Sequence, residues 1–222
     1  MMRTNEHGLL FQPDMARANV AGLKTMTRRG NALKEINANP DAWRFDGIVD
    51  RDEVPHARFV DSRTSIPVGY QKGTDILRLN PSRGEFLVKF LWQVGDLIYQ
   101  KETWKPMNDL EGGGIPRLGI TWGKGVTFKA GNPDQSGPWK SSLFLEKRFA
   151  RFWAEIISIK VERVRDISAE DCIKEGLSTT LREHDAVVHL RDQYRILYDR
   201  INGASSFERD WCWVIEYREV KR

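Results

Sequence analysis

The chain has 222 residues, of which 40% are hydrophobic and 10% aromatic, enough to bury a core and too many for a disordered chain. The 35 lysines and arginines slightly outnumber the 31 acidic residues, and this small excess does not by itself indicate a nucleic-acid-binding protein. Two cysteines argue against a disulfide scaffold, and since no apolar run approaches the roughly 18 residues of a membrane span, we expect a soluble cytoplasmic protein with no membrane partner.

The first predicted elements are a short strand and a helix. Residues 1–7 lack the apolar segment of a signal peptide. Residues 9–11 are apolar and predict a buried strand, and Pro13 suits the first turn of a helix, where no backbone N–H donor is needed. Gly22 is typical of the position just after a helix end, so residues 24–29 are expected in a loop or strand.

Residues 22–29, with the sequence GLKTMTRR, place an amine, two hydroxyls and two guanidiniums directly after that helix. Lys24 and Thr27 are three residues apart and can meet in a turn, where a lysine of lowered pKa could deprotonate the hydroxyl or a water. Arg28 and Arg29 supply planar forks of donors that suit phosphate or carbonyl-rich bases. The alternative is a solvated basic loop with no binding role.

Residues 30–84 differ in character from the flanking chain. They are rich in asparagine, proline and glycine, and their apolar residues show little periodicity. We therefore expect an irregular insertion within a single domain that spans residues 1–222, with short strands near residues 57–60 and 76–79. Regular structure is expected to resume at residues 86–90.

A further strand is expected over residues 97–104, where Glu102 and Trp104 fall on the same face by alternation. A carboxylate next to an indole at a strand end can bind a base edge while the ring stacks on the base. The alternative for Glu102 is an ordinary ion pair at the rim of a barrel.

A basic and aromatic segment follows at residues 139–153. Lys140, Lys147 and Arg148 are interleaved here with tryptophan and phenylalanine, a composition typical of a nucleic-acid groove. The same pattern also fits a core of aromatic side chains beneath solvated cations.

The last part of the chain has the clearest periodicity. Residues 157–161 and 211–217 alternate between apolar and polar positions and predict two strands. Apolar residues at spacings of three and four predict a helix over residues 184–201. Ser168 and Gly176 are suited to begin and end a short helix before it.

Glu175 is expected in the last turn of this short helix, at the negative end of the helix dipole. An exposed carboxylate there is disfavoured by only about 0.3–1 kcal/mol, so a tolerated surface glutamate is one interpretation. If the group is buried, its protonated form is favoured, which suits a general acid or base.

Strands interrupted by isolated helices, with no regular strand–helix–strand repeat, indicate an α+β, barrel-like domain rather than a doubly wound sheet. The four histidines lack the spacing of metal ligands, and neither cysteine has a nearby partner. We therefore expect neither a metal nor another cofactor.

Four segments in series resemble the ASCH domain family of the PUA-like barrel superfamily, and in particular its longer members from bacteriophages and prophages. Residues 9–29 resemble the family's opening strand, helix and G-x-K-T-x-T-R-R signature. Residues 94–104 resemble its G-D-x-x-x-x-x-E-T-W strand, and residues 163–177 resemble its I-S-x-E-D-x-x-x-E-G segment. Residues 211–216 resemble its closing W-V-W-V-I-E strand, whereas residues 30–84 have no counterpart.

This resemblance implies a mixed β-barrel whose cleft holds a modified nucleoside or RNA. Some small bacterial proteins similar to this chain are amidohydrolases that remove the acetyl group from N4-acetylcytidine, and their functional residues fall on Lys24, Thr27 and Glu175. Lys24 would then act as base, Thr27 as nucleophile and Glu175 as acid or base.

Two departures leave the activity open. The chain is much longer than those enzymes, and its second arginine and E-T-W strand belong to the phage-type branch. The alternatives are a module that binds RNA or a modified base without turnover, and a ribonuclease that uses the same residues on a phosphodiester. The residues expected to contact substrate or nucleic acid are Arg28, Arg29, Glu102, Trp104, Lys140, Lys147 and Arg148.

Overall fold

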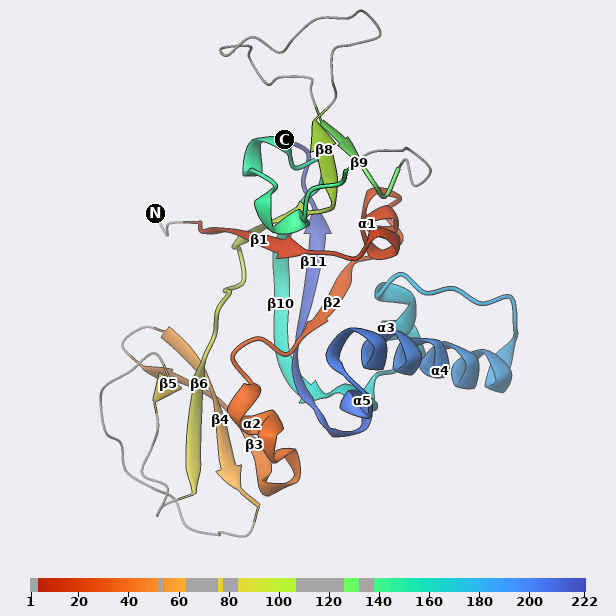
Figure 1. Cartoon of the computed structure of the whole chain (residues 1–222). Helices are drawn as coiled ribbons and strands as arrows, with labels where there is room; N and C mark the ends of the chain where they lie inside the picture. Colours follow the sequence, from red (N-terminus) through yellow and green to blue (C-terminus); the bar gives the residue numbers. More distant parts are fainter. Residues whose placement is uncertain (1–3, 52–53, 63–75, 78–83, 107–125, 132–137) are drawn as a thin grey trace, which may run out of the picture.

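The computed structural model describes residues 4–51, 54–62, 76–77, 84–106, 126–131 and 138–222. These residues combine helices with separate sheets, so the fold class is α+β, as the sequence predicted (Figure 1). One sheet has five strands, a second has four and a third has two. Among the described strands the sheets are open, and none of them closes into a barrel.

The five-stranded sheet has the order β1-β7-β10-β11-β2. Its strands are β1 (Glu6–Leu10), β7 (Leu97–Lys101), β10 (Trp153–Arg163), β11 (Trp211–Glu219) and β2 (Met26–Arg29). β1 and β7 pair in parallel, whereas the other pairs of this sheet are antiparallel. β2 is therefore an edge strand, held in the sheet by β11 alone.

β11 is buried on both faces, which explains its composition. Trp211, Trp213, Ile215 and Tyr217 belong to the main hydrophobic core. Cys212 and Val214 belong to a second core, which lies against the helices. Because successive strand residues point to opposite faces, this one strand contributes to both cores.

The four-stranded sheet is antiparallel throughout and has the order β3-β4-β6-β5. Its strands are β3 (Trp43–Arg51), β4 (Val54–Asp61), β6 (Glu85–Lys89) and β5 (Ile76–Leu77). The region predicted as an irregular insertion is thus more regular than expected over its described part. The predicted strands near residues 57–60 and 76–79 fall on β4 and β5, although residues 78 and 79 lie outside the described ranges.

Distant aromatic contacts explain this regularity. Phe59 on β4 packs edge-on against Trp211 with ring centroids 5.4 Å apart, and Phe90 just after β6 packs on Trp213 at 4.5 Å. The four-stranded sheet therefore shares the main core with β11. Local periodicity does not reveal such contacts, because their partners lie far away in the sequence.

The expected continuous strand over residues 97–104 is interrupted. β7 ends before Glu102, and β8 (Trp104–Pro106) forms a separate two-stranded sheet with β9 (Val126–Phe128). The side chain of Glu102 turns inward at the break, where Arg151 binds it. Glu102 thus lies between the two strands and takes part in a partly buried ion pair.

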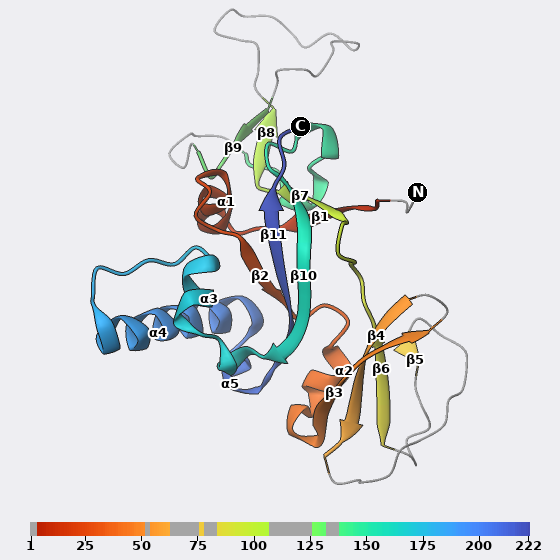
Figure 2. The ribbon, with the colours of Figure 1, turned by 180° about the vertical axis from the view of Figure 1, so that it is seen from behind.

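The helices are α1 (Pro13–Val20), α2 (Lys34–Ala38), α3 (Ala169–Lys174), α4 (Glu183–Asn202) and α5 (Ser206–Arg209). α3, α4 and α5 lie together beside β2, and the same grouping is seen from behind (Figure 2). Short 3-10 helices occupy Pro40–Ala42, Ser142–Phe144, Lys147–Phe149 and Val164–Asp166. In the described part of the chain, no helix has the length and apolarity needed to cross a membrane.

The second core attaches these helices to the sheet. Leu190 and Tyr194 on α4 and Phe207 on α5 pack in the same cluster as Met26 of β2 and Cys172 of α3. Consequently α3 and α4 are both held against the strand that carries Thr27, Arg28 and Arg29.

Candidate active site

The backbone that precedes β2 places the amine of Lys24 inside the protein. Gly22 adopts a left-handed conformation (φ +70°) after α1, as expected for a residue that ends a helix. The N–H of Lys24 then donates to the carbonyl of Ala18 (3.2 Å), and the N–H of Thr25 donates to the carbonyl of Lys174 at the end of α3 (2.8 Å). This loop is thereby fixed to α1 and α3, and the Lys24 side chain is buried.

α3 presents Glu175 to the same place. Ser168 caps the helix by accepting a hydrogen bond from the N–H of Asp171 (3.0 Å), and the helix ends with Glu175 as its C-terminal cap. Gly176 follows with φ +92°, and a Cβ there would lie 2.9 Å from the Cβ of Ala18. The predicted short helix is confirmed, and glycine after it is required for both conformation and space.

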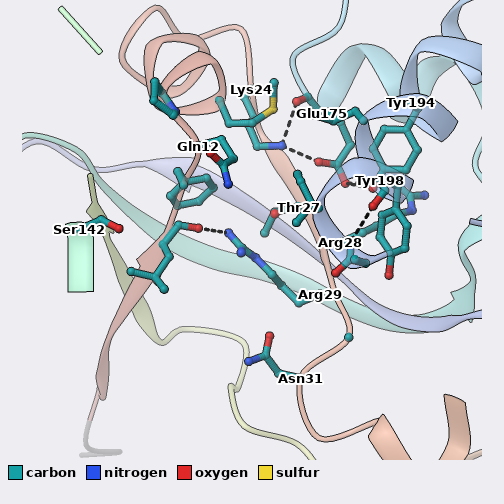
Figure 3. A pocket seen from close by; sticks show the side chains of 18 of the residues that line it. Gln12, Lys24, Thr27, Arg28, Arg29, Asn31, Ser142, Glu175, Tyr194 and Tyr198 are labelled. Atoms are coloured by element: carbon teal, nitrogen blue, oxygen red, sulfur yellow. Dashed lines mark hydrogen bonds and ion pairs between the residues drawn. The ribbon is translucent and has the colours of Figure 1, made fainter. Parts of the chain in front are cut away.

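Lys24 and Glu175 form a buried ion pair. The Nζ of Lys24 lies 2.5 Å from the Oε2 of Glu175 and donates a second hydrogen bond to the backbone carbonyl of Glu175 at 2.8 Å (Figure 3). Both side chains are at most 5% exposed. Burial lowers the pKa of Lys24, and the Glu175 carboxylate opposes this shift. The amine is therefore tied to a carboxylate and shielded from water.

Arg28 holds three carboxylates together beneath this pair. Its Nη2 lies 2.5 Å from Glu162 and 2.6 Å from Asp171, and its Nη1 lies 3.4 Å from Oε1 of Glu175. Burial acts against the charge of Arg28, but Glu175 and other nearby groups leave its pKa raised. The hydroxyl of Tyr194 donates to the same oxygen of Glu175 at 3.4 Å. Glu175 is therefore held in one orientation from several sides.

Thr27 and Arg29 lie on the opposite face of β2 from Arg28, since they alternate along the strand. Thr27 is buried and lines the cavity described below. The Nη2 of Arg29 donates to the carbonyl of Leu10 (2.8 Å), and its guanidinium lies over the ring of Phe11 at 4.9 Å. Burial lowers the pKa of Arg29, although Glu175 opposes the shift.

These side chains surround one cavity of about 370 Å³. Apolar residues of the β1–α1 junction and of α4 form part of its wall, and Figure 3 shows the polar groups between them. Thr27 lies between the Lys24–Glu175 pair and Arg29 (Figure 3). Among the candidate residues from the sequence, the cavity brings together Lys24, Thr27, Arg28, Arg29 and Glu175.

The structure places Glu102 and Trp104 outside the described lining of this cavity, although Thr103 between them belongs to it. Glu102 is almost fully buried. Its carboxylate accepts two hydrogen bonds of 2.8 Å from Arg151 and a third from Gln100 at 2.9 Å. It has the contacts of a structural ion pair, the alternative that the sequence left open. Trp104 is also buried and stacks on a neighbouring phenylalanine ring.

The expected basic groove does not form part of the cavity either. Lys147 pairs with Glu6 (2.5 Å), and Arg148 pairs with Glu146 (3.0 Å). Lys140 lies 5.0 Å from the centre of the Trp104 ring. These three cations are exposed and are located away from the lining residues.

Several site residues were missed from the sequence. Tyr194 fits the apolar pattern of its helix, and this pattern does not indicate that its hydroxyl donates to Glu175. Glu162 and Asp171 carry no local signal that distinguishes them from solvent-facing acidic residues of a strand and a short helix. These contacts depend on the packing of β2 against α3 and α4 and on the pairing of β2 and β10 with β11, so local spacing could not reveal them.

Comparison of the chain with protein-family models, with curated proteins and with solved structures finds no match. The geometry of the cavity and the four resembling segments are therefore the grounds for a functional proposal.

Proposed function

We propose that the cavity binds a nucleobase or nucleoside and that Lys24, Thr27 and Glu175 hydrolyse an amide bond on it. The observation that carries this proposal is the convergence of the three residues on one cavity, with the Nζ of Lys24 2.5 Å from Glu175. The resemblance to ASCH proteins supplies the substrate class, an N4-acylated cytidine or a related modified nucleoside. The bond to be broken is the one between the acyl carbon and the exocyclic amine.

The Lys24–Glu175 pair can supply both a base and an acid. Lys24 is a base only as a neutral amine, and its short contact with Glu175 offers a direct path for moving one proton to the carboxylate. Burial favours this neutral pair because it disfavours the charged amine. Arg28 and Tyr194 contact the other oxygen of Glu175, Oε1, and so hold the carboxyl group in place beside Lys24.

The reaction then follows in two balanced steps. Neutral Lys24 takes the proton of the Thr27 hydroxyl, and the threonine oxygen bonds to the acyl carbon. The carbon–nitrogen bond breaks, and the departing amine receives the proton held by Glu175. In the second step a water attacks the acyl-threonine, which releases the carboxylic acid and restores the hydroxyl.

The curvature of the sheet supports a PUA-like arrangement as part of this proposal. β1 and β2 are the two edges of the five-stranded sheet, yet the Arg29 side chain on β2 donates to the carbonyl of Leu10 on β1. The sheet therefore curls until its edges are bridged by a side chain. Such a curled sheet is what a barrel-like fold of the ASCH type requires.

A binding module without turnover is the second candidate. The observation that favours it is the same buried pair, because a protonated Lys24 bound to ionised Glu175 is satisfied and inert as a base. In that state the cavity would hold a modified base and release it unchanged.

An assay of acylated nucleosides tests the proposal. The protein is incubated with N4-acetylcytidine and with a panel of other N-acylated nucleosides, and the products are separated by chromatography. Deacylated nucleoside should appear with the wild type and disappear with Lys24→Ala, Thr27→Ala and Glu175→Gln, each shown to be folded. Lys147→Ala, which removes an exposed lysine outside the cavity, is the matched control.

Equal rates for the wild type and the three cavity variants would contradict the proposal. Binding of the nucleoside without any product would favour the second candidate. Cleavage of RNA instead of the amide would point to a ribonuclease.

A further inference from the structure

The charges around the cavity are unevenly matched. Among its described lining residues, Lys24, Arg28 and Arg29 are cationic and Glu175 is acidic. Lys24 is paired with Glu175, and Arg28 is paired with three carboxylates. Arg29 has no carboxylate at ion-pair distance among the residues that the structure describes. Within the described part of the lining, Arg29 is therefore a cation that no carboxylate neutralises.

The guanidinium of Arg29 is also short of hydrogen-bond acceptors. Its Nη2 bonds to the carbonyl of Leu10, which is its single hydrogen bond within the described residues. Its Nε–H is buried without a partner. The contact with Leu10 and the stacking on Phe11 explain why the side chain is positioned here, but they leave the charge and most of the donors unused. A partly buried cation in this condition is stabilised by an anion that enters the cavity.

The position of Arg29 sets where such an anion would lie. Thr27 separates Arg29 from the Lys24–Glu175 pair, so the reacting end and the cationic end of the cavity are distinct (Figure 3). Gln12, Asn31 and Ser142 line the cavity as well, and all three are neutral and polar. The lining described by the structure thus places its one acidic residue at the reacting end.

We propose that the ligand of this cavity is a phosphorylated nucleotide rather than a neutral nucleoside, with Arg29 binding the phosphate. This inference rests on the proposed function, because the base is assigned to the end occupied by Lys24, Thr27 and Glu175. A guanidinium suits the role since its planar fork can donate two parallel hydrogen bonds to one phosphate. Neutral analogues leave the Arg29 charge unmatched and bind more weakly.

The phosphate can belong to a mononucleotide or to an RNA chain. A second hollow of about 490 Å³ adjoins the cavity and shares Gly30, Asn31, Tyr198 and Asn202 with its lining. Lys34 also lines this hollow. An RNA chain that extends out of the cavity could occupy this hollow and contact Lys34. Mononucleotides and RNA are therefore both tested as ligands.

Calorimetric titration measures the preference directly. Thr27→Ala serves as the binding protein because it removes the nucleophile and preserves every charge. Cytidine, its 5′- and 3′-monophosphates, a cytidine trinucleotide and inorganic phosphate are compared at the same low salt. At least one phosphorylated ligand should bind about tenfold to a hundredfold more tightly than cytidine, as expected for a charge-assisted hydrogen bond.

Arg29 variants assign the preference to one side chain. Adding Arg29→Gln to the binding protein should remove the preference and leave cytidine affinity nearly unchanged, whereas Arg29→Lys should retain part of it. Arg218→Gln, which neutralises an exposed arginine outside the cavity, should leave the preference intact. A preference confined to the trinucleotide would identify a phosphodiester of RNA as the ligand group, and one shown by a monophosphate would identify a free nucleotide.

The preference is measured first with Thr27→Ala alone, so a misfolded Arg29→Gln protein cannot hide the answer. Equal affinity for cytidine and for every phosphorylated ligand would overturn the inference, and so would a preference that survives Arg29→Gln. Neither result would contradict the proposed deacylation, because deacylation is measured in a separate assay. Conversely, a phosphate preference without turnover would sustain the inference while the proposed hydrolysis fails.

Discussion

Lys24 and Glu175 lie 151 residues apart in the sequence, yet 2.5 Å separates their Nζ and Oε2 atoms in the folded chain. Lys24 follows the end of α1 and Glu175 follows the end of α3, so the pair joins the ends of two helices. Their contact links the stability of the fold to the chemistry of the cavity, and variants of the two residues can separate these two roles.

Loss of the Glu175 carboxylate should stop turnover. Glu175→Gln keeps the size of the side chain and removes the acid, so the rate of deacylation should fall by about 10²–10⁴-fold. Glu162→Gln is the control, because Glu162 also binds Arg28 but does not line the cavity. Product formation is followed by chromatography. Equal losses in both variants would mean that Glu175 acts only by holding Arg28.

Loss of Lys24 should destabilise the protein more than loss of a surface lysine. Lys24→Met leaves Glu175 buried with fewer partners and should reduce the free energy of unfolding by about 3–5 kcal/mol. Lys147→Met breaks a pair with the same 2.5 Å separation at the surface and should leave the unfolding transition close to that of the wild type, because solvent screens an exposed pair. Urea titration measures both values. Comparable losses would show that the Lys24 pair is not buried in solution.

Catalysis should weaken at high pH. The Lys24–Glu175 pair must hold one proton for the departing amine, and burial lowers the pKa of Lys24 below that of a free lysine, against the opposing effect of Glu175. The value of kcat/KM should therefore fall as the pH rises through a pKa below about 10.4, where that shared proton is lost. A rate that keeps rising beyond about pH 10.4 would contradict a mechanism in which Lys24 and Glu175 share one proton.

Stability should rise with pH across the same range. When the folded pKa of a lysine lies below its unfolded pKa, the unfolded chain binds more protons between the two values, so the free energy of unfolding rises with pH across that window. The difference between wild type and Lys24→Met should consequently grow as the pH approaches about 10.4. Taking this difference removes the shared titration of buried tyrosines such as Tyr194, whose pKa burial raises.

Two glycines with left-handed backbones should respond differently to alanine. Gly176→Ala adds a Cβ that would lie 2.9 Å from Ala18 and 3.2 Å from the Cβ of Lys24, so it should cost about 2–4 kcal/mol through strain and crowding. Gly22→Ala adds a Cβ in open space. It should lower the free energy of unfolding only through the strain of a left-handed backbone, by about 1–2 kcal/mol. Unfolding curves give both costs. Equal costs would show that the ends of α1 and α3 are not in close contact.

The local sequence indicated several residues that line the cavity, but it did not indicate the residues that contact them. Lys24, Thr27 and Glu175 were assigned from two short segments and a resemblance, and the end of α3 was visible from Gly176. The partners of Arg28 were not predictable, because strand pairing and helix packing determine which carboxylates reach it. Glu162, for example, approaches Arg28 only because β10 and β2 both pair with β11.

The same limit explains the differences in the fold. Strands β3 and β4 lack a clear pattern of their own, and aromatic contacts with distant β11 stabilise them. Glu102 had the composition of a base-binding group, but its partner Arg151 lies 49 residues away and was not identified. In each case a contact between remote segments decided the outcome.

The pairing of β2 with β11 also affects when the cavity can form during synthesis. β2 leaves the ribosome well before β11 and has no other neighbour among the described strands of the sheet, so Thr27 to Arg29 stay unpaired until β11 has been made. The carbonyl of Thr25 likewise awaits the N–H of Tyr217. Contacts between such distant segments form slowly in folding. A nascent chain would therefore complete most of its other strands before it could bind a ligand.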